Sequence, residues 1–196
     1  MLLSSLTPAS RFERPRPRLV CVDLQREYVV PGRPLFAAGA GEIAETCVRV
    51  LAHARAADWR VVHVRRRLSD GLFDVSGHFG APIEGLRPLI REPVFAHSTL
   101  SAFGNRDFDF EMREALGEEV FLMGFSLSGS LLATALGAID AGLSPTVIAD
   151  AAGAAPAPGI DHETARDAAM TLLGSLVRMA DSRQVLDVGA AVGAPA

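Results

Sequence analysis

The sequence predicts an α/β fold: a three-layer α-β-α arrangement around a central, mostly parallel sheet of about six strands. Short apolar runs alternate along the chain with longer segments of helical periodicity, which is typical of parallel sheets with helices on both sides. The apolar runs are continuous rather than alternating, as expected of strands covered on both faces. With 196 residues, 49% of them hydrophobic, the chain is long enough for one such domain.

Each expected strand is a short apolar run with a charged or turn-forming boundary. RLVCVDL is closed by a charge at Asp23, RVVHVRR ends in arginines and EPVFAH ends at His97. EEVFLMGF and PTVIAD follow later in the chain, and RMAD is a short sixth candidate. The strands predicted in this way are 18–24, 60–66, 92–97, 118–125, 145–150 and 178–181.

The helices between these strands are predicted from periodicity and from capping residues. Ile43, Cys47 and Leu51 recur at helical spacing and give the first helix one buried face. Asn105 is a candidate N-cap for the second helix, and Asp161 is one for the fourth. The predicted helices are 41–58, 105–116, 128–143 and 161–177.

The domain is expected to span residues 18–187. Residues 1–17 alternate proline with charge and predict an extended arm, while 188–196 form a low-complexity tail that is expected to be flexible. The long loop over 71–88 carries turn signals and is expected to shape specificity.

Charge and hydropathy exclude several classes of function. A formal net charge of −4 argues against a nucleic-acid-binding surface, and no apolar run approaches the length of about 18 residues that a membrane span needs. The opening MLLSSL is too short for a signal peptide, so the expected location is cytoplasmic. Cys21 and Cys47 fit reduced core residues. All 19 basic residues are arginine, and the chain contains no lysine.

Polar residues gather where ligands bind in such sheets, at the carboxyl ends of the strands. Asp23 can orient or deprotonate a partner, and His97 is a natural general base near neutral pH. Ser126, Ser128 and Ser130 stand at the start of a helix, whose free N–H groups can stabilise an oxyanion. Each also has a structural interpretation: a loop-capping aspartate, a histidine bound to backbone, and a serine that caps the helix.

Three stretches, VDLQ, EPVFAHSTLSAF and GFSLSGSLLATALGAIDAG, together resemble the isochorismatase-like hydrolases, also called cysteine hydrolases. The resemblance covers roughly residues 18–187 and implies the same layered fold. The amidohydrolases of this family use an aspartate, a lysine and a nucleophilic cysteine. Those positions are occupied here by Asp23, His97 and Ser130. The resemblance also implies a cis peptide bond at Phe125–Ser126 and an oxyanion hole formed by the N–H groups of Ser126 and Ser130.

The two departures from the family pattern leave three interpretations open. In the first, Asp23 orients His97, His97 activates Ser130, and the rebuilt triad hydrolyses a C–N bond of a small amide or ureido compound. In the second, hydrolysis needs no nucleophile, as in the vinyl ether chemistry of the isochorismatases. In the third, catalysis is lost and the protein binds a small ligand or a protein partner.

A fourth interpretation comes from outside the family. GFSLS resembles the nucleophile elbow of α/β-hydrolases, with Ser126 as nucleophile and Asp150 and His162 following in the chain order of that fold. The second glycine of the elbow is Ser128 here, and the segment between Ser126 and His162 is short for that fold.

Further residues are expected to bind substrate. Gln25 matches the family motif beside Asp23. Arg65, Arg66 and Arg67 follow the second strand, and at least one of them, with Arg65 singled out, is a candidate for holding a substrate carboxylate; solvated strand-end arginines are the alternative. Tyr28, Phe103 and His78 are expected to line or close the pocket.

No metal site and no cofactor are expected. His63 and His78 have no ligand spacing, and no glycine-rich phosphate loop is present. The expected partner is a small molecule rather than a nucleic acid or a membrane. The family resemblance also suggests a homodimer or homotetramer.

Overall fold

The structure, a computed structural model, describes residues 15–68, 71–74, 77–156 and 158–188. It contains one sheet of six parallel strands in the order β3-β2-β1-β4-β5-β6. The predicted fold class is therefore confirmed. The strands are β1 Arg18–Val22, β2 Arg60–Arg66, β3 Val94–His97, β4 Val120–Phe125, β5 Pro145–Gly153 and β6 Arg178–Ala180.

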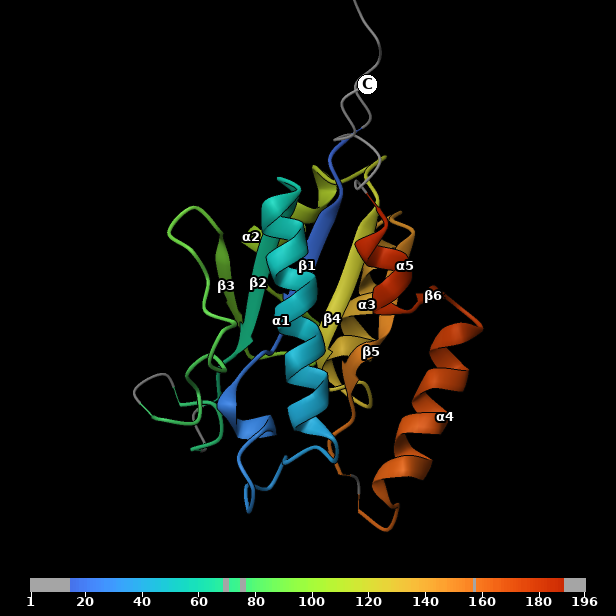
Figure 1. The fold of residues 1–196 in the computed structure, drawn as a ribbon. Coiled ribbons are helices and arrows are strands. Elements are labelled where there is room, and N and C mark those ends of the chain that lie inside the picture. The colour runs from blue at the N-terminus through green and yellow to red at the C-terminus, as the bar shows by residue number, and fades with distance from the viewer. Residues whose placement is uncertain (1–14, 69–70, 75–76, 157, 189–196) are drawn as a thin grey trace, which may run out of the picture.

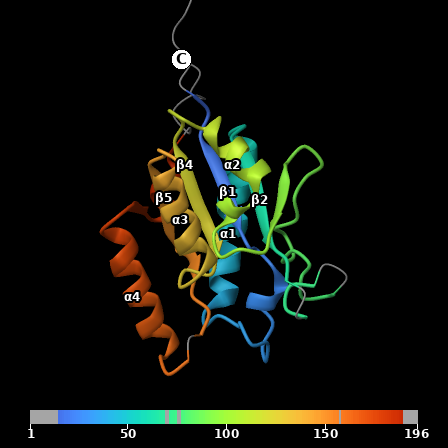
Figure 2. The same cartoon turned by 180° about the vertical axis from the view of Figure 1, so that it is seen from behind.

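Helices cover both faces of this sheet. Helices α1 and α5 lie over the face seen in Figure 1, and α2 and α3 lie over the opposite face, seen in Figure 2. The helices are α1 Ala40–Ala56, α2 Arg106–Arg113, α3 Ser130–Asp140, α4 His162–Gly174 and α5 Ser182–Leu186. Two short 3₁₀ turns, η1 Arg26–Tyr28 and η2 Ala102–Gly104, follow β1 and β3. No described helix is long and apolar enough to cross a membrane.

The predicted elements agree with the structure except in two places. Helix α5 was not predicted, because its five residues are too few for a periodic pattern; it depends instead on Asp150, whose carboxylate accepts hydrogen bonds from the N–H and hydroxyl of Ser182. Strand β5 continues to Gly153, three residues beyond the predicted end, through alanines that read as a loop. Most of the expected arm and tail lies outside the described residues.

Close packing between the central strands requires a glycine at position 124. Gly124 pairs with Val22 across β1 and β4 and has a φ of +123°. A Cβ at this position would lie 2.0 Å from the carbonyl oxygen of Val22. Any larger residue would push β4 away from β1 just before both strands reach the edge where the polar residues gather.

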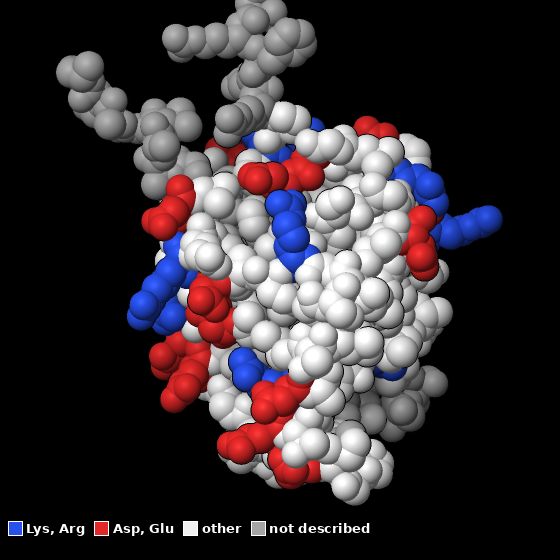
Figure 3. Space-filling view, turned by 90° about the vertical axis from the view of Figure 1, so that its right-hand side faces the viewer, with Lys and Arg blue, Asp and Glu red and all other residues white. Residues whose placement is uncertain are grey.

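The face on the α4 side carries a broad area of uncharged side chains (Figure 3). Ile139 of α3, Leu172 of α4 and Leu176 just after α4 are exposed apolar residues of this region of the fold. Apolar surface of this kind is compatible with the homo-oligomer expected from the sequence, which stays a prediction.

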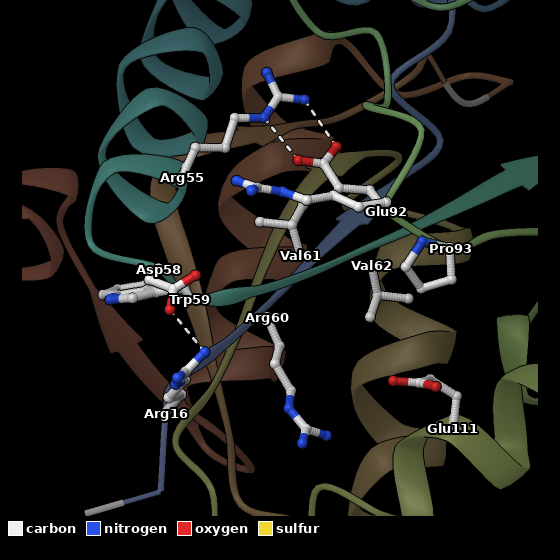
Figure 4. Close-up of a pocket in the computed structure, with 11 residues that line it drawn as sticks. Arg16, Arg55, Asp58, Trp59, Arg60, Val61, Val62, Glu92, Pro93 and Glu111 are labelled. Atoms are coloured by element: carbon white, nitrogen blue, oxygen red, sulfur yellow. Dashed lines mark hydrogen bonds and ion pairs between the residues drawn. The ribbon is translucent and has the colours of Figure 1, made fainter.

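A buried ionic network holds the start of β3. Glu92 accepts two hydrogen bonds from Arg55 of α1, both of 2.8 Å, one of 2.9 Å from His63 of β2 and one of 2.8 Å from the N–H of Leu89. Burial opposes the charge on Glu92, but these donors outweigh it and lower the pKa of the carboxyl to about 2. Figure 4 shows the Arg55–Glu92 pair on the wall of a cavity of about 360 Å³ at the amino ends of the strands.

This network predicts a large effect of Glu92→Gln, because the amide removes the charge and turns a donor toward Arg55 or His63. We expect the free energy of unfolding to fall by about 3 kcal/mol at pH 7, as measured by urea denaturation. The lowered pKa makes the contribution complete above the ordinary value of 4.5 and removes it as the pH falls toward 2, so the gap between the proteins should narrow in acid.

The matched control is Glu84→Gln, which changes an exposed glutamate in the preceding loop. It should alter the free energy of unfolding by less than about 0.5 kcal/mol. Equal effects of the two substitutions at pH 7 would show that Glu92 does not hold β3 in the way described.

Candidate active site

Three side chains from distant parts of the sequence meet at the carboxyl edge of the sheet. Asp23 follows β1, His97 ends β3, and Ser130 is the first residue of α3. Asp23 lies between the other two: its Oδ1 is 2.8 Å from Nε2 of His97, and its Oδ2 accepts a hydrogen bond of 2.6 Å from the Ser130 hydroxyl. The strand order explains why these residues meet. β1 has β2 and β3 on one side and β4, which leads into α3, on the other, and the strands are parallel, so their carboxyl ends lie at one edge.

Asp23 occupies an unusual backbone position. Its φ of +49° lies in the left-handed region, which aspartate tolerates better than most residues but which still costs energy. The turn directs the chain out of β1 while the N–H of Asp23 remains bound to the carbonyl of Val64 in β2. The carboxylate is thus held from the backbone as well as by its two side-chain partners.

His97 is held as a cation by its two hydrogen bonds. Its Nδ1 lies 2.9 Å from the carbonyl oxygen of Thr99, which can only accept, so Nδ1 carries a proton. Its Nε2 faces the Asp23 carboxylate, which accepts a hydrogen bond from a second N–H of the ring. Burial lowers the pKa of His97, but the hydrogen bond and charge of Asp23 outweigh it, and the pKa is raised overall.

The order of these contacts differs from the predicted relay, in which His97 would activate Ser130. Both nitrogens of His97 are already engaged as donors, and the Ser130 hydroxyl donates to Asp23 instead. The group that faces the Ser130 proton is therefore the Asp23 carboxylate. The imidazole of His97 is short, so it reaches the Asp23 carboxylate but not the Ser130 hydroxyl on the other side of it. This is the geometric reason why the contacts differ from the predicted relay.

The chain between β4 and α3 forms a tight turn around the serines. The peptide bond between Phe125 and Ser126 is cis, as the family resemblance implied. The N-cap residue of α3 is Gly129, and no serine side chain caps the helix. Within the described residues, the N–H groups of Ser126 and Ser130 donate to no other protein group. These two N–H groups are free to stabilise an oxyanion.

The side chain of Ser126 is occupied by structural bonds. Its hydroxyl accepts a hydrogen bond of 3.0 Å from the N–H of Ala155 and lies 3.0 Å from the hydroxyl of Ser128. Asp150 caps α5, and Nδ1 of His162 has no hydrogen-bond partner among the described residues. The α/β-hydrolase arrangement of Ser126, Asp150 and His162 is therefore not assembled.

Tyr28 packs against the candidate site. Its ring stacks on Phe125 at 5.1 Å between centroids, and the Ser130 hydroxyl acts on its phenol by lowering its pKa. Burial and the charge of Asp23 raise the pKa of Tyr28 well above its ordinary value, so the phenol keeps its proton and remains a donor. Of the residues expected to line the pocket, Tyr28 is the one that the structure places at Ser130.

Gln25 holds the surrounding loops rather than facing open space. Its amide nitrogen donates to the carbonyls of Arg66 and Gly80, both at 3.0 Å, and its amide oxygen accepts the N–H of Arg66 at 2.8 Å. Both amide protons and the amide oxygen are thus used by backbone groups. Gln25 was expected to bind substrate, but these contacts give it a different role: it positions the end of β2.

Three other expected residues lie outside the cluster. Phe103 packs its ring on Phe108 of α2, with centroids 5.0 Å apart, and lines a cavity beside α3. His78 is exposed, and its Nδ1 lies 3.4 Å from a guanidinium nitrogen of Arg26. Arg65 lies on the same face of β2 as His63, whose pKa its charge lowers. None of the three contacts the candidate triad through a described hydrogen bond.

Arg66 is one of the three strand-end arginines that the sequence offers, although Arg65 was singled out. Arg66 pairs with His97 in the parallel register of β2 and β3 and lies on the same face as Val62 and Val64. Its charge lowers the pKa of both His97 and Tyr28. The period of two along β2 could have separated Arg66 from Arg65 once the register with His97 was known.

Neither cysteine can act as the missing nucleophile. Cys21 and Cys47 are buried and free, as expected of core residues. Burial raises the pKa of the Cys47 thiol to about 12 and that of Cys21 well above its ordinary value. Thiols in this state are not nucleophilic at neutral pH.

The site is closed in this structure. The side chains of Asp23 and His97 have no exposed area, and Ser130 is equally buried. A cavity of about 480 Å³ lies at the carboxyl end of β5, between the starts of α1 and α4, and Ala154 on its wall precedes the residue that binds Ser126. A substrate therefore reaches the triad only after neighbouring side chains move.

Comparison with known proteins identifies the family of this chain. A sequence model described as the isochorismatase domain matches residues 17–181. This chain belongs to the isochorismatase family. A maleamate amidohydrolase from Pseudomonas putida is 27% identical over 154 residues, which are 70% of this chain and 72% of that protein.

Solved structures of isochorismatase-family proteins have the same fold. The crystal structure of an isochorismatase from Pseudomonas putida superposes with a TM-score of 0.76 at 26% identity, covering 89% of this chain and 94% of the other. That of a cysteine hydrolase from Pseudomonas syringae superposes with a TM-score of 0.80 at 17% identity, covering 90% and 93%.

Opposite shifts of two buried histidines can be tested by NMR. In a pH titration of the ring signals, His97 should titrate above about 6.5 and His63, whose pKa burial lowers, should titrate below it. The raised pKa makes the contribution of His97 to stability complete below about pH 6.5 and removes it as the pH rises through the folded-state value. A His97 that titrates with or below His63 would contradict the cationic assignment; His97→Gln identifies its signal.

Proposed function

We propose that this protein hydrolyses the C–N bond of a small amide or ureido compound, with Ser130 as the nucleophile and Asp23 as its base. The observation that carries the proposal is the 2.6 Å hydrogen bond from the Ser130 hydroxyl to Asp23, whose other oxygen is held by His97. A serine hydroxyl becomes nucleophilic when a positioned base removes its proton.

In the first step, Oγ of Ser130 attacks the carbonyl carbon of the substrate while its proton passes to Oδ2 of Asp23. The carbonyl oxygen becomes an oxyanion, which the free N–H groups of Ser126 and Ser130 can stabilise. These groups are fixed before the reaction, and the second belongs to the first residue of an eleven-residue helix, whose dipole favours negative charge at that end.

The tetrahedral intermediate then collapses and breaks the C–N bond. Asp23 returns the proton to the departing nitrogen, so that ammonia or an amine leaves and an acyl group remains on Ser130. A water molecule repeats the sequence: Asp23 takes its proton, the hydroxide attacks the acyl carbon, and Ser130 leaves with the proton from Asp23. The net reaction adds one water and releases one carboxylic acid.

His97 contributes a positive charge rather than a base. Its imidazolium holds Oδ1 of Asp23 and compensates the carboxylate in a buried site. In the family amidohydrolases that the chain resembles, a lysine occupies this position. Histidine supplies the same charge with a shorter side chain, and the Thr99 carbonyl fixes the ring from the other side.

The similarity to a maleamate amidohydrolase supports amide hydrolysis over the vinyl ether chemistry of the isochorismatases. The hydrogen bond from Ser130 to Asp23 also favours a covalent route. The serine hydroxyl already occupies the position beside the base, so it can attack the substrate directly and no water molecule is needed as the nucleophile. The complete burial of the triad is the observation that favours a non-catalytic family member, and the experiment below includes that outcome.

The proposal predicts that Ser130 reacts with a fluorophosphonate and that Ser130→Ala loses amide hydrolysis. We expect intact-mass analysis to show one adduct on the natural protein and none on the variant. In an ammonia-release assay over small amides, Ser130→Ala should lower kcat/KM by at least about 1000-fold.

Ser128→Ala is the matched control, because Ser128 is an exposed hydroxyl in the same turn. It should keep the adduct, and its rate should remain within a few-fold of the natural protein. An adduct that survives in Ser130→Ala would assign the nucleophile to another residue. A folded protein with neither adduct nor ammonia release would support a binding protein instead, and ammonia release without an adduct would support nucleophile-free chemistry.

A further inference from the structure

Arg66 is a cation beside the candidate site that pairs with no described carboxylate. Asp23 and His97 form one pair of opposite charges. Glu27, which follows on η1, is fully buried and pairs with Arg33, with 2.8 Å between Oε2 and a guanidinium nitrogen. The guanidinium of Arg66 has no hydrogen bond or ion pair with any described residue. Over these five described residues, the charges therefore leave a net positive charge.

The position of Arg66 is fixed from its backbone. Gln25 binds both its N–H and its carbonyl, so the residue cannot shift along β2. Its register partner in β3 is His97. Its charge lowers the pKa values of His97 and Tyr28, in agreement with this register.

The guanidinium is also partly withdrawn from water. Its Nε is buried without a hydrogen-bond partner among the described residues, although the side chain as a whole is half-buried. A buried donor on a charged group costs free energy until an acceptor reaches it. A carboxylate is the acceptor that matches the planar fork of arginine, because it can bind through both oxygens.

We propose that Arg66 binds a carboxylate of the substrate, so that the substrate is a short amide that also carries an acid group. This inference rests on the proposed function for the amide end only. The sheet order puts β1 between β2 and β4, so the ends of the strands that carry Arg66 and lead to Ser130 are about 10 Å apart.

That separation sets the shape of the ligand. The amide carbonyl lies at Ser130, the chain of the substrate crosses the end of β1 above Asp23, and the acid group reaches the arginine. Since the side chain of Arg66 spans part of the gap, a four- or five-carbon amic acid matches the distance better than a long or aromatic amide. The net positive charge favours such a monoanion over a neutral amide.

The test compares charged and neutral amides on three variants. Maleamate and succinamate carry the acid group, and crotonamide and butanamide are neutral counterparts. Arg66→Gln should lower kcat/KM for the two amic acids by about 100-fold, mainly through KM, while the neutral amides change by less than about threefold. Arg66→Lys should recover part of the loss, because it restores the charge without the fork.

Arg67→Gln is the control, since Arg67 is an exposed arginine one residue further along. A second measurement is calorimetric binding of maleate to Ser130→Ala and to Ser130→Ala combined with Arg66→Gln or Arg67→Gln. Binding should be lost only in the combination with Arg66→Gln. Near-UV circular dichroism tests whether each variant is folded. If Arg66→Gln does not fold, the comparison is made with Arg66→Lys instead.

The outcomes separate the two proposals. Hydrolysis of neutral amides as fast as amic acids, or equal effects of the Arg66 and Arg67 substitutions on maleate binding, would overturn the role of Arg66 and leave the serine mechanism intact. Binding of maleate that depends on Arg66, without ammonia release from any amide, would support the carboxylate site and count against the hydrolase.

Discussion

The structure of the site depends on the Asp23 carboxylate and its two hydrogen bonds. One oxygen binds a histidine cation at the end of β3, and the other binds the hydroxyl at the start of α3. These elements lie on opposite sides of β1, so a single buried anion joins three parts of the fold. Such an anion is tolerated in the interior only because it is paired and fully hydrogen-bonded.

Remote contacts in the fold serve this arrangement. The Glu92 network fixes the beginning of the strand that ends at His97, although it lies at the other edge of the sheet. Gly124 allows β4 to approach β1, and β4 leads directly into the turn of Ser126 and Ser130. Precision at the carboxyl edge is thus set by packing and charge pairs along the full length of the strands.

The sequence predicted the fold correctly and named three residues that the structure brings together, for physical reasons. Buried parallel strands leave continuous apolar runs, and the residues that end them must meet at one edge. The order of contacts within the cluster was predicted incorrectly, because it depends on side-chain reach and on the Thr99 carbonyl, a backbone group that leaves no trace in residue type. Among the three strand-end arginines, the sequence did not single out Arg66, because strand register decides which face each arginine takes. Gln25 matched a motif whose letters do not distinguish a ligand contact from a backbone clamp.

The clamp formed by Gln25 has a mechanical consequence. The side-chain amide of Gln25 is hydrogen-bonded to the backbone of Arg66 at the end of β2 and also to the carbonyl of Gly80 in the long loop. Arg66 and the loop are therefore mechanically coupled, because a displacement of either one strains the same three hydrogen bonds of Gln25. Sequence variation in the loop would be transmitted to the arginine without any direct contact. Relatives with altered loops would then differ in the ligands they accept even where every residue facing the ligand is the same.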